Sequence, residues 1–332
     1  MLKQNKTDYS AIALFSGGLD SLLAVKWMQK AGYKVYPVYF LTPYMPIERA
    51  LESARDNGLD LIIRDITEEH LKMMQDPETS FGKNLNPCID CHALMFRMAG
   101  DMLSELDADF LISGEVVGQR PMSQRRDTLN RVAKLSGYRD LIIRPLSQKL
   151  LRKNTPIREG WVDLSDMLDF HGRGRSRQLQ LAEELGITRF PSPAGGCLLT
   201  DRNYTLRIKD LISHQQMDEK NLELLKYGRH FRLDESTKLI IGRDERENDC
   251  LERLSDGLIR LKAKNQNGPL GLLTDDPADP IILNLALSIF WFYHPKAPQS
   301  GIINIRQGGK SKEHEGQKAS PELSKQYRIS YD

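Results

Sequence analysis

Residues 16–21 read Ser-Gly-Gly-Leu-Asp-Ser, a set of residue types suited to binding phosphate. Gly17 and Gly18 lack a Cβ atom, so the backbone can turn at positive φ and bring its N–H groups close to an anion. An apolar run, residues 11–15, precedes the segment, and a helical pattern over residues 22–27 follows it. The pattern predicts a strand, a glycine turn and the start of a helix, whose unpaired N–H groups and dipole favour phosphate.

Asp20 is the one residue of this loop that does not suit a phosphate. A carboxylate oxygen is a good ligand for Mg²⁺, which usually bridges to substrate phosphates, so we predict that Asp20 holds Mg²⁺. The segment lacks the Gly-Lys-Ser/Thr ending of a Walker A loop and the spacing of a dinucleotide-binding fingerprint. We therefore predict a phosphate-binding loop of another kind, made by Ser16, Gly17, Gly18, Asp20 and Ser21.

Three of the four cysteines form a second candidate site. Cys88 and Cys91 make a C-x-x-C pair that we predict to lie in a turn before a helical run, residues 93–106. Cys197 ends a loop rich in proline and glycine, residues 191–197. Three thiolates suit a 4Fe-4S cluster, because a cluster normally takes four ligands and the fourth iron would be left to hold a sulfur or substrate atom.

Two other chemistries fit the same cysteines. A structural zinc site needs four protein ligands, so His92 or His171 would have to complete it. In the other alternative, Cys197 carries sulfur as a persulfide and a cysteine of the pair resolves it. Under each reading Cys88, Cys91 and Cys197 are the candidate metal or sulfur ligands, and Cys197 is also a candidate catalytic residue together with Asp20.

The composition bounds the class of protein. A chain of 332 residues with 40% hydrophobic content is long enough for two or three domains with cores of their own. We find no apolar run near the ~20 residues that span a bilayer, and the polar start of the chain is unlike a signal peptide. Four cysteines in a chain this long do not make a disulfide framework. These features predict a soluble cytoplasmic protein without a membrane partner.

Positive charge is concentrated between residues 119 and 153, although the net charge of the whole chain is only +2. That stretch holds ten Lys or Arg residues against two acids, a local charge of +8. A second basic cluster follows at residues 171–177. Because phosphate contacts give affinity for a polyanion, both clusters favour nucleic acid over a solvated helix face. The candidate RNA-binding residues are Arg120, Arg125, Arg126, Arg173 and Arg175.

The elements that must position these residues alternate between strand and helix. Strand-like runs lie at residues 11–15, 35–40, 59–63, 110–113 and 141–143, with helical patterns between them. This alternation predicts an α/β fold with a parallel sheet and helices on both faces. Ligands of such sheets bind beyond the carboxyl ends of the strands, so Gly114 and Glu115, which follow the fourth run, join the candidate nucleotide pocket.

The sequence changes character after Asp201, to charged helices and one strand-like run at residues 238–241. We predict a nucleotide-binding domain over residues 1–202 and a smaller α+β domain over residues 203–305. Residues 306–332 are polar, which predicts a poorly packed tail.

Three segments together resemble the tRNA thiolation enzymes of the ATP pyrophosphatase (PP-loop) superfamily, and most closely the catalytic domain of tRNA 4-thiouridine synthetase. Residues 16–21 resemble the pyrophosphate loop of that superfamily. Residues 111–124 resemble its Gly-Glu-Ser-x-Gly-Gln segment with a downstream Ser-Gln, although Val116 replaces the serine. The cysteine segments, residues 86–91 and 192–197, are similar to those of cluster-bearing tRNA thiouridylases, including the 2-thiouridine branch.

The resemblance implies an enzyme that cleaves ATP between the α and β phosphates, adenylates a uridine carbonyl oxygen and replaces that oxygen with sulfur. It implies ATP, Mg²⁺ and a 4Fe-4S cluster as cofactors and tRNA as the partner. The sulfur donor would be a cysteine desulfurase or sulfide, and a homodimer stays open. 4-Thiouridine is the favoured product and 2-thiouridine the alternative.

Two other classes of protein share part of this pattern. A PP-loop ligase or amidotransferase acting on a small metabolite would use the loop but needs neither the basic clusters nor the three cysteines. A non-catalytic RNA-binding protein with a degenerate ATPase domain is hard to reconcile with an intact Ser-Gly-Gly-x-Asp-Ser. Residues 241–249 resemble an RNA-binding module of ribosome-associated quality-control factors, which would place RNA docking behind the catalytic domain instead of ahead of it.

Overall fold

The computed structural model describes residues 8–79, 81, 87–120, 123–191, 197–295 and 298–330. The chain divides into two compact units, Met1–Leu198 and Leu199–Asp332. The junction lies close to residue 202, where the sequence predicts a domain boundary. Within the described part of the chain, no helix has the length and apolar character that crossing a membrane requires.

The N-terminal unit is built on a parallel sheet with the strand order β3-β2-β1-β4-β5. Its strands are β1 (Ser10–Leu14), β2 (Lys34–Leu41), β3 (Ile62–Asp65), β4 (Phe110–Ser113) and β5 (Ile142–Ile143). Its helices are α1 (Leu19–Lys30), α2 (Glu48–Asp56), α3 (Thr67–Gln75), α4 (Cys88–Asp101), α5 (Arg126–Ser136), α6 (Thr155–Arg158) and α7 (Ser176–Glu184). The parallel α/β fold predicted from the sequence is confirmed.

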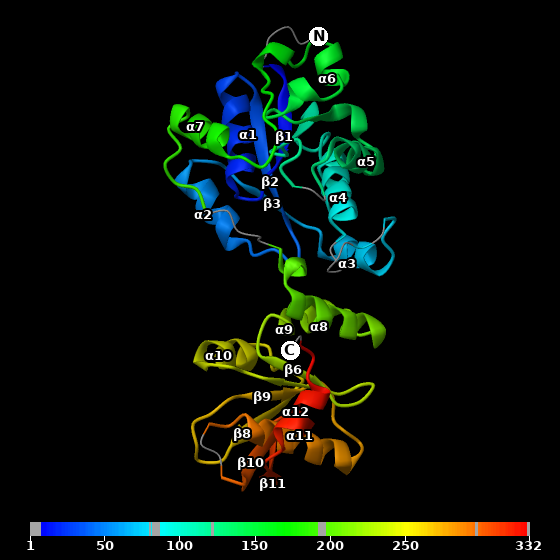
Figure 1. Ribbon diagram of the computed structural model, residues 1–332, viewed down its shortest axis with the longest axis vertical. Coiled ribbons are helices and arrows are strands. Elements are labelled where there is room, and N and C mark those ends of the chain that lie inside the picture. Colours follow the sequence, from blue (N-terminus) through cyan, green and yellow to red (C-terminus); the bar gives the residue numbers. More distant parts are fainter. Residues whose placement is uncertain are drawn as a thin grey trace. The chain divides into compact units, whose positions relative to one another are not determined.

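Helices cover both faces of this sheet, and the side chains of β1 alternate between the two cores. Ala11 and Ala13 pack with Leu22 of α1, whereas Ile12 packs with Phe96 of α4. Figure 1 shows α1 and α7 on one side of the sheet and α4 and α5 on the other. Because both faces are buried, the strands are apolar almost throughout instead of alternating with polar residues.

The strand order reverses at the centre of the sheet, where β1 lies between β2 and β4. Parallel strands that run to opposite sides of such a switch point leave a crevice between the loops at their carboxyl ends. The loop from β1 to α1 and the loop that follows β4 are therefore neighbours. These two loops carry the candidate nucleotide-binding residues.

The C-terminal unit is built on an antiparallel sheet with the strand order β11-β10-β8-β9-β7-β6. Its strands are β6 (Arg229–Arg232), β7 (Lys238–Ile241), β8 (Ile259–Ala263), β9 (Gly271–Leu273), β10 (Ser300–Gln307) and β11 (Lys310–Gln317). Its helices are α8 (Arg202–Ser213), α9 (Glu219–Leu224), α10 (Glu245–Arg253), α11 (Pro280–Phe292) and α12 (Pro321–Tyr327). The α+β class predicted for this domain is confirmed, although the sequence indicated only one of the strands.

The prediction of a poorly packed tail from residue 306 is wrong. β10 and β11 pair along their whole length as an antiparallel hairpin, and Leu323 and Tyr327 of α12 pack against the core. β11 is an edge strand, and Gly316 is its one fully buried residue. Backbone pairing at a sheet edge needs no apolar alternation, so the polar sequence of β11 gave no strand signal.

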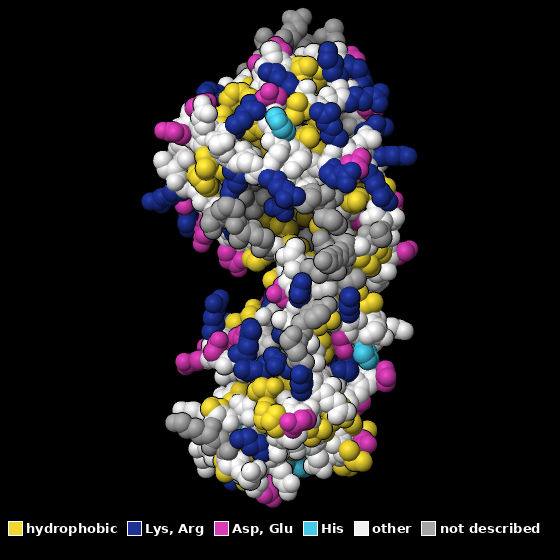
Figure 2. All heavy atoms as spheres, viewed as in Figure 1, with side chains coloured by type: hydrophobic (Ala, Val, Ile, Leu, Met, Phe, Trp, Pro, Cys, Tyr) yellow, Lys and Arg dark blue, Asp and Glu magenta, His cyan; other side chains and the backbone are white. Residues whose placement is uncertain are grey.

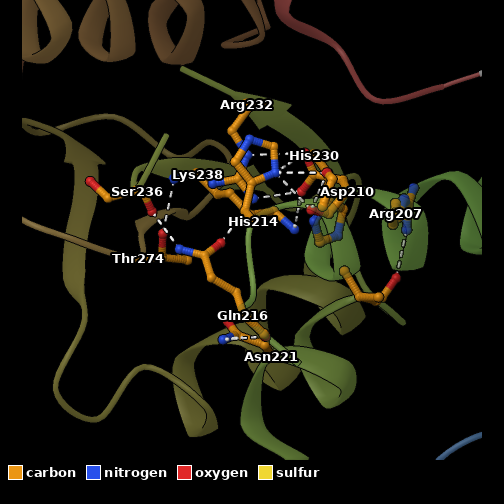
Figure 3. A network of polar contacts seen from close by, with 12 residues as sticks. Arg207, Asp210, His214, Gln216, Asn221, His230, Arg232, Ser236, Lys238 and Thr274 are labelled. Carbon is orange, nitrogen blue, oxygen red and sulfur yellow. Dashed lines mark hydrogen bonds and ion pairs between the residues drawn. The ribbon is translucent and has the colours of Figure 1, made fainter. Parts of the chain in front are cut away.

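A buried polar network joins α8 to β6 and β7 (Figure 3). The carboxylate of Asp210 accepts hydrogen bonds from Nε and Nη2 of Arg232, at 2.9 and 2.7 Å, and lies 3.3 Å from Nζ of Lys238. Burial lowers the pKa of Lys238 to about 8, against the opposing effect of Asp210. Burial pushes the pKa of Asp210 up, but Arg232 and Lys238 outweigh it and lower that pKa. The network is internally paired and serves the fold.

Candidate functional site

The loop from β1 to α1 is held in a conformation that requires glycine. Gly17 has a φ of +75°, and a Cβ atom there would lie 2.6 Å from Cα of Ala50, at the start of α2. The hydroxyl of Ser21 donates to the carbonyl of Gly18 at 2.8 Å, and it lies 3.4 Å from the hydroxyl of Ser16. α1 begins after Gly18 without a side-chain cap. Its first N–H groups therefore open toward the loop, which is the geometry that binds phosphate.

Gly114, the residue after β4, lies against the backbone of Asp20. A Cβ atom on Gly114 would come within 2.4 Å of the Asp20 carbonyl oxygen and 2.5 Å of the Ser21 nitrogen. Real side chains do not tolerate such distances, so glycine is required at this position. The structure thus brings together the loops after β1 and β4, as the strand pattern predicts, and gives Gly114 a packing role.

Asp20 is half-buried, and its two carboxylate oxygens have different surroundings. Its Oδ2 accepts a hydrogen bond of 2.7 Å from Nε2 of Gln119, whereas its Oδ1 is buried and has no hydrogen-bond partner among the described residues. Burial raises the pKa of Asp20, opposed by the bond from Gln119 and by the charges of Arg175 and Arg120. A buried carboxylate oxygen without a partner fits a hard cation, so the residues present fit Mg²⁺ at Asp20.

Two glutamines connect Asp20 to α7, and sequence reasoning did not assign them. Gln119 donates to Asp20, and the Oε1 of Gln119 accepts from Nε2 of Gln178 at 3.2 Å. Gln178 is almost fully buried. Gln119 stands within the segment that resembles the thiolase motif, but nothing local in the sequence links it to Gln178, which lies far along the chain.

Glu115, which the sequence assigns to the candidate nucleotide pocket, belongs to a buried ion pair. Its Oε2 lies 2.8 Å from Nε of Arg144, and its Oε1 lies 3.0 Å from Nδ1 of His92. Burial pushes the pKa of Glu115 up, but Arg144 and His92 outweigh it and lower that pKa to about 2. Both Glu115 and Arg144 are 6% exposed. Arg144 therefore does not contribute to the surface charge that was counted in the basic stretch.

Cys88 and Cys91 lie in the first turn of α4, so the prediction that the pair sits in a turn ahead of the helix is wrong. The backbone N–H of Cys91 already donates to the carbonyl of Pro87 at 2.8 Å, which starts the helix at the cysteines. Burial, followed by the charges of Cys197 and Cys88, raises the pKa of the Cys91 thiol. The thiols of Cys88 and Cys197 therefore each lie near enough to Cys91 to affect its charge. The glycine-rich part of the loop before Cys197, residues 192–196, lies outside the described residues.

His70 of α3 is the histidine that contacts a cysteine, and the sequence gave no signal for it. Its Nε2 lies 3.4 Å from Sγ of Cys91, its ring is tilted against Tyr44 at 5.1 Å, and it is 1% exposed. Its Nδ1 is buried without a hydrogen-bond partner among the described residues. Burial, first among the causes, also raises the pKa of Tyr44, and the charges of Cys197 and Cys91 add to it. The Tyr44–His70 ring pair thus lies beside Cys91.

The two histidines considered for a zinc site have other partners. Nδ1 of His92 is occupied by Glu115, and Nδ1 of the exposed His171 lies 3.1 Å from the carbonyl of Asp169. Among the residues that the structure describes, no group of three or more His, Cys, Asp or Glu side chains has the spacing to hold a metal ion. Cys88 and Cys197 act electrostatically on the thiol of Cys91, so the donor atoms near one another are sulfurs and not the Nδ1 atoms of His92 or His171.

The five predicted RNA-binding arginines separate into two groups. The charges of Arg120 and Arg175 act on Asp20, so these two side chains lie beside the PP-loop. Arg125, Arg126 and Arg173 are exposed, and Arg125 is paired with Asp127 at 3.3 Å.

The loop and the cysteines are linked by a short series of contacts within one unit. Gly114 lies against Asp20, the next residue Glu115 binds His92, and His92 directly follows Cys91. The path from the phosphate loop to the cysteine site is therefore short: one backbone contact, one hydrogen bond and two peptide bonds.

Comparison with known families matches two segments of the chain. Residues 6–151 match the family described as Thiamine biosynthesis protein (ThiI), and residues 228–328 match the NFACT protein RNA binding domain. Both parts of the resemblance drawn from the sequence are thereby confirmed: the N-terminal unit carries a ThiI-type PP-loop domain, and the C-terminal unit carries an NFACT-type RNA-binding domain.

Similar proteins carry related names. A probable tRNA sulfurtransferase of Methanosarcina acetivorans is 32% identical over 124 residues, which are 34% of this chain and 29% of that protein. Another, of Thermococcus kodakarensis, is 32% identical over 152 residues, which are 41% of this chain and 38% of that protein. The chain thus spans well under half the length of these curated relatives.

Two solved structures are distantly similar. A 4-thiouridine synthetase in complex with RNA and ATP is 20% identical, with a TM-score of 0.35 over 54% of this chain and 52% of that one. The U34-tRNA thiolase NcsA of Methanococcus maripaludis, solved with its [4Fe-4S] cluster, is 15% identical, with a TM-score of 0.33 over 68% of this chain and 73% of that one. Scores this low establish no common fold for whole chains, and the fold assignment rests on the sheet order and the family matches.

Proposed function

We propose that the protein is an ATP-dependent tRNA sulfurtransferase, which adenylates a uridine carbonyl and replaces its oxygen with sulfur. The observation that carries the proposal is the short link between the two candidate sites: Gly114 lies against Asp20, and Glu115 holds the histidine that follows Cys91. The names of the similar proteins support the same chemistry, and so does the RNA-binding domain. We expect the protein to act in the cytoplasm.

The activation step belongs to the loop between β1 and α1. The N–H groups around Gly17 and Gly18 bind the phosphates of ATP, and Arg120 and Arg175 neutralise their charge. The uridine oxygen attacks the α phosphorus, the bond to the bridging oxygen breaks, and pyrophosphate leaves. Mg²⁺ held by Asp20 would neutralise charge on the phosphates. Positioning and charge neutralisation supply most of the rate in such transfers.

The sulfur step belongs to the cysteines. Sulfur at the oxidation level of sulfide bonds to the activated carbon, and AMP leaves with the former carbonyl oxygen. Cys88, Cys91 and Cys197 would hold a 4Fe-4S cluster, which supplies an iron without a protein ligand. In the persulfide alternative, the outer sulfur of Cys197 bonds to the carbon and AMP leaves. A thiol of the pair then attacks the Cys197 sulfur, which forms a disulfide and frees the thiocarbonyl. An external dithiol must then reduce that disulfide before the next turnover.

The target is a uridine of tRNA, with 4-thiouridine as the favoured product and 2-thiouridine as the alternative. Reaching the carbonyl requires an unstacked base, and Arg125, Arg126 and Arg173 are placed on the surface to hold neighbouring phosphates. The sulfur donor is a cysteine desulfurase or free sulfide. A desulfurase persulfide can pass its outer sulfur to Cys197, whereas free sulfide is at the oxidation level that the cluster route requires.

The test uses the full chain purified without oxygen, an unmodified tRNA transcript, ATP, Mg²⁺ and sulfide. We expect a thiolated nucleoside to form only when ATP is present. Digestion of the tRNA, chromatography and mass spectrometry would identify it. Cys91→Ser should lose the product, whereas Cys250→Ser should retain it, because Cys250 lies in the other unit. Absence of both 4-thiouridine and 2-thiouridine, with iron-loaded protein and with a persulfide donor, would overturn the proposal. Iron content and the visible spectrum separate the cluster from the persulfide.

A further inference from the structure

Four arginines of the C-terminal unit gather at one end of the β6–β7 pair. We call Arg207, Arg229, Arg243 and Arg328 the arginine cluster. Arg229 begins β6 and its strand partner is Ile241, so Arg243 follows β7 at the same end of the pair. Figure 2 shows Lys and Arg side chains gathered on the face of this unit over β6 and α10.

Hydrogen bonds within the unit fix the guanidinium groups of Arg207 and Arg243. Arg207 donates to the carbonyls of Leu225 and Gly228, at 2.6 and 3.0 Å, while its Nε is buried without a partner among the described residues. Arg243 is oriented by Glu247, which accepts from its backbone N–H and from its Nε, both at 2.9 Å. The same carboxylate accepts from the N–H of Gly228 at 3.2 Å, so its oxygens are already used by the fold.

Arg229 is placed by an aromatic contact, and the backbone that carries Arg328 is placed by contacts with β6. The guanidinium of Arg229 lies 4.8 Å from the ring centroid of Tyr293, a cation–π contact that holds it in one orientation. Arg328 forms an isolated bridge with Phe231, and the N–H of Ile329 donates to the carbonyl of His230 at 2.8 Å. These contacts fix the segment that carries Arg328 along the free edge of β6, where its side chain is exposed.

Positive charge in the cluster exceeds the negative charge available to it. Within the described residues, Glu247 pairs with Arg243, and no carboxylate lies within ion-pair distance of Arg207, Arg229 or Arg328. Burial, first among the causes, lowers the pKa of Arg207 to about 10, and the charges of Arg243 and Arg328 lower it further, against Asp201 and Glu247. The guanidinium groups repel one another, and a bound anion would offset that repulsion.

We propose that the arginine cluster binds consecutive backbone phosphates of RNA and that it is the main electrostatic contact of this domain with its substrate. Arginine suits this task because its planar fork matches phosphate geometry. The cluster is open and spread over a strand end, a loop and the strand edge, which suits a chain of phosphates better than one small anion. Three of its members, Arg229, Arg243 and Arg328, fall within the matched RNA-binding domain, and the proposal rests on the proposed function only in taking that RNA to be tRNA.

The test compares two triple variants of the full chain. The cluster variant is Arg229→Gln/Arg243→Gln/Arg328→Gln, which keeps Arg207 because that side chain supports the backbone. The control is Arg306→Gln/Lys310→Gln/Lys312→Gln, which removes the same charge from exposed positions of the β10–β11 hairpin. A second cluster variant, Arg229→Gln/Arg328→Gln, leaves the ion pair with Glu247 intact and guards against misfolding, which thermal melts would reveal.

The probe is a labelled tRNA transcript titrated at several salt concentrations. We expect the cluster variant to bind about 10-fold more weakly and to lower the slope of log K against log salt by roughly 2 to 3, with less than about a twofold change in the control. Equal losses in the two triple variants, or no loss in either, would overturn the proposal. Thiouridine formation at limiting tRNA should fall in the cluster variant and stay close to wild type in the control. Absence of thiouridine from the wild type, with the affinity difference present, would sink the proposed function and leave this proposal standing.

Discussion

The two units each bury an aspartate, and the two aspartates have opposite surroundings. Asp210 in the C-terminal unit is paired with Arg232 and Lys238, and its pKa is lowered. Asp20 in the N-terminal unit has one oxygen bonded to Gln119 and one oxygen without a described partner, and its pKa is raised. A fully paired buried charge serves the fold, whereas a buried carboxylate with an unused oxygen is prepared for a ligand.

The largest expected effect on stability is at Asp210. Asp210→Asn leaves Lys238, which is 1% exposed, without its carboxylate, so we expect the free energy of unfolding to fall by about 3 to 5 kcal/mol. Chemical denaturation measures this, with Asp256→Asn as an exposed control in the same unit. Asp20→Asn should leave the free energy of unfolding unchanged or raise it. A loss at Asp20 as large as that at Asp210 would remove the contrast between them.

A somewhat smaller effect is expected at Glu115, the paired carboxylate of the N-terminal unit. Glu115→Gln leaves Arg144 buried and unpaired, which should lower the free energy of unfolding by about 3 kcal/mol at pH 7. The folded pKa of Glu115 is about 2, below its usual range, so its contribution is complete above roughly pH 5 and is lost as the pH falls toward 2. The free energies of unfolding of the wild type and of Glu115→Gln, measured by chemical denaturation, should therefore converge as the pH falls toward 2. A constant difference from pH 7 to 2 would contradict the ion pair.

The smallest effect expected concerns the glutamines that orient Asp20. Gln119→Ala should raise the Mg²⁺ concentration that gives half-maximal pyrophosphate release by about 10-fold, because hydrogen-bond partners of metal ligands contribute to metal affinity on that order. Gln178→Ala acts through Gln119 and should do less. Gln180→Ala, on the same helix but exposed, is the matched control. If all three variants behave alike, the glutamines do not position Asp20.

Local sequence predicted the elements around the loop well. The strand predicted at residues 110–113 matches β4, and the strand predicted at 11–15 differs from β1 by one residue at each end. Apolar runs bounded by glycine carry that information without help from distant parts of the chain. The run at 59–63 was displaced from β3, because Leu59 is a core residue that lies outside the strand.

Long-range pairing explains what the sequence did not reveal. Glu115 bonds to Arg144, Gln119 to Gln178, and His70 to Cys91, and each pair joins elements separated along the chain. Spacing rules describe neighbours on one helix or strand, so they cannot find such pairs. β11 was missed for a related reason. It is held by backbone pairing with β10 and has no apolar face that a sequence pattern could reveal.

The most direct test measures pyrophosphate release and thiouridine formation in the same reaction, with tRNA, ATP, Mg²⁺ and a sulfur donor. In the proposed mechanism, activation at Asp20 and sulfur delivery at the cysteines are separate steps, so Cys91→Ser should still release pyrophosphate in a tRNA-dependent manner but form no thiouridine. Asp20→Asn should lower both by roughly 100-fold or more. Undiminished thiouridine in Asp20→Asn, or loss of pyrophosphate release in folded Cys91→Ser, would contradict the account.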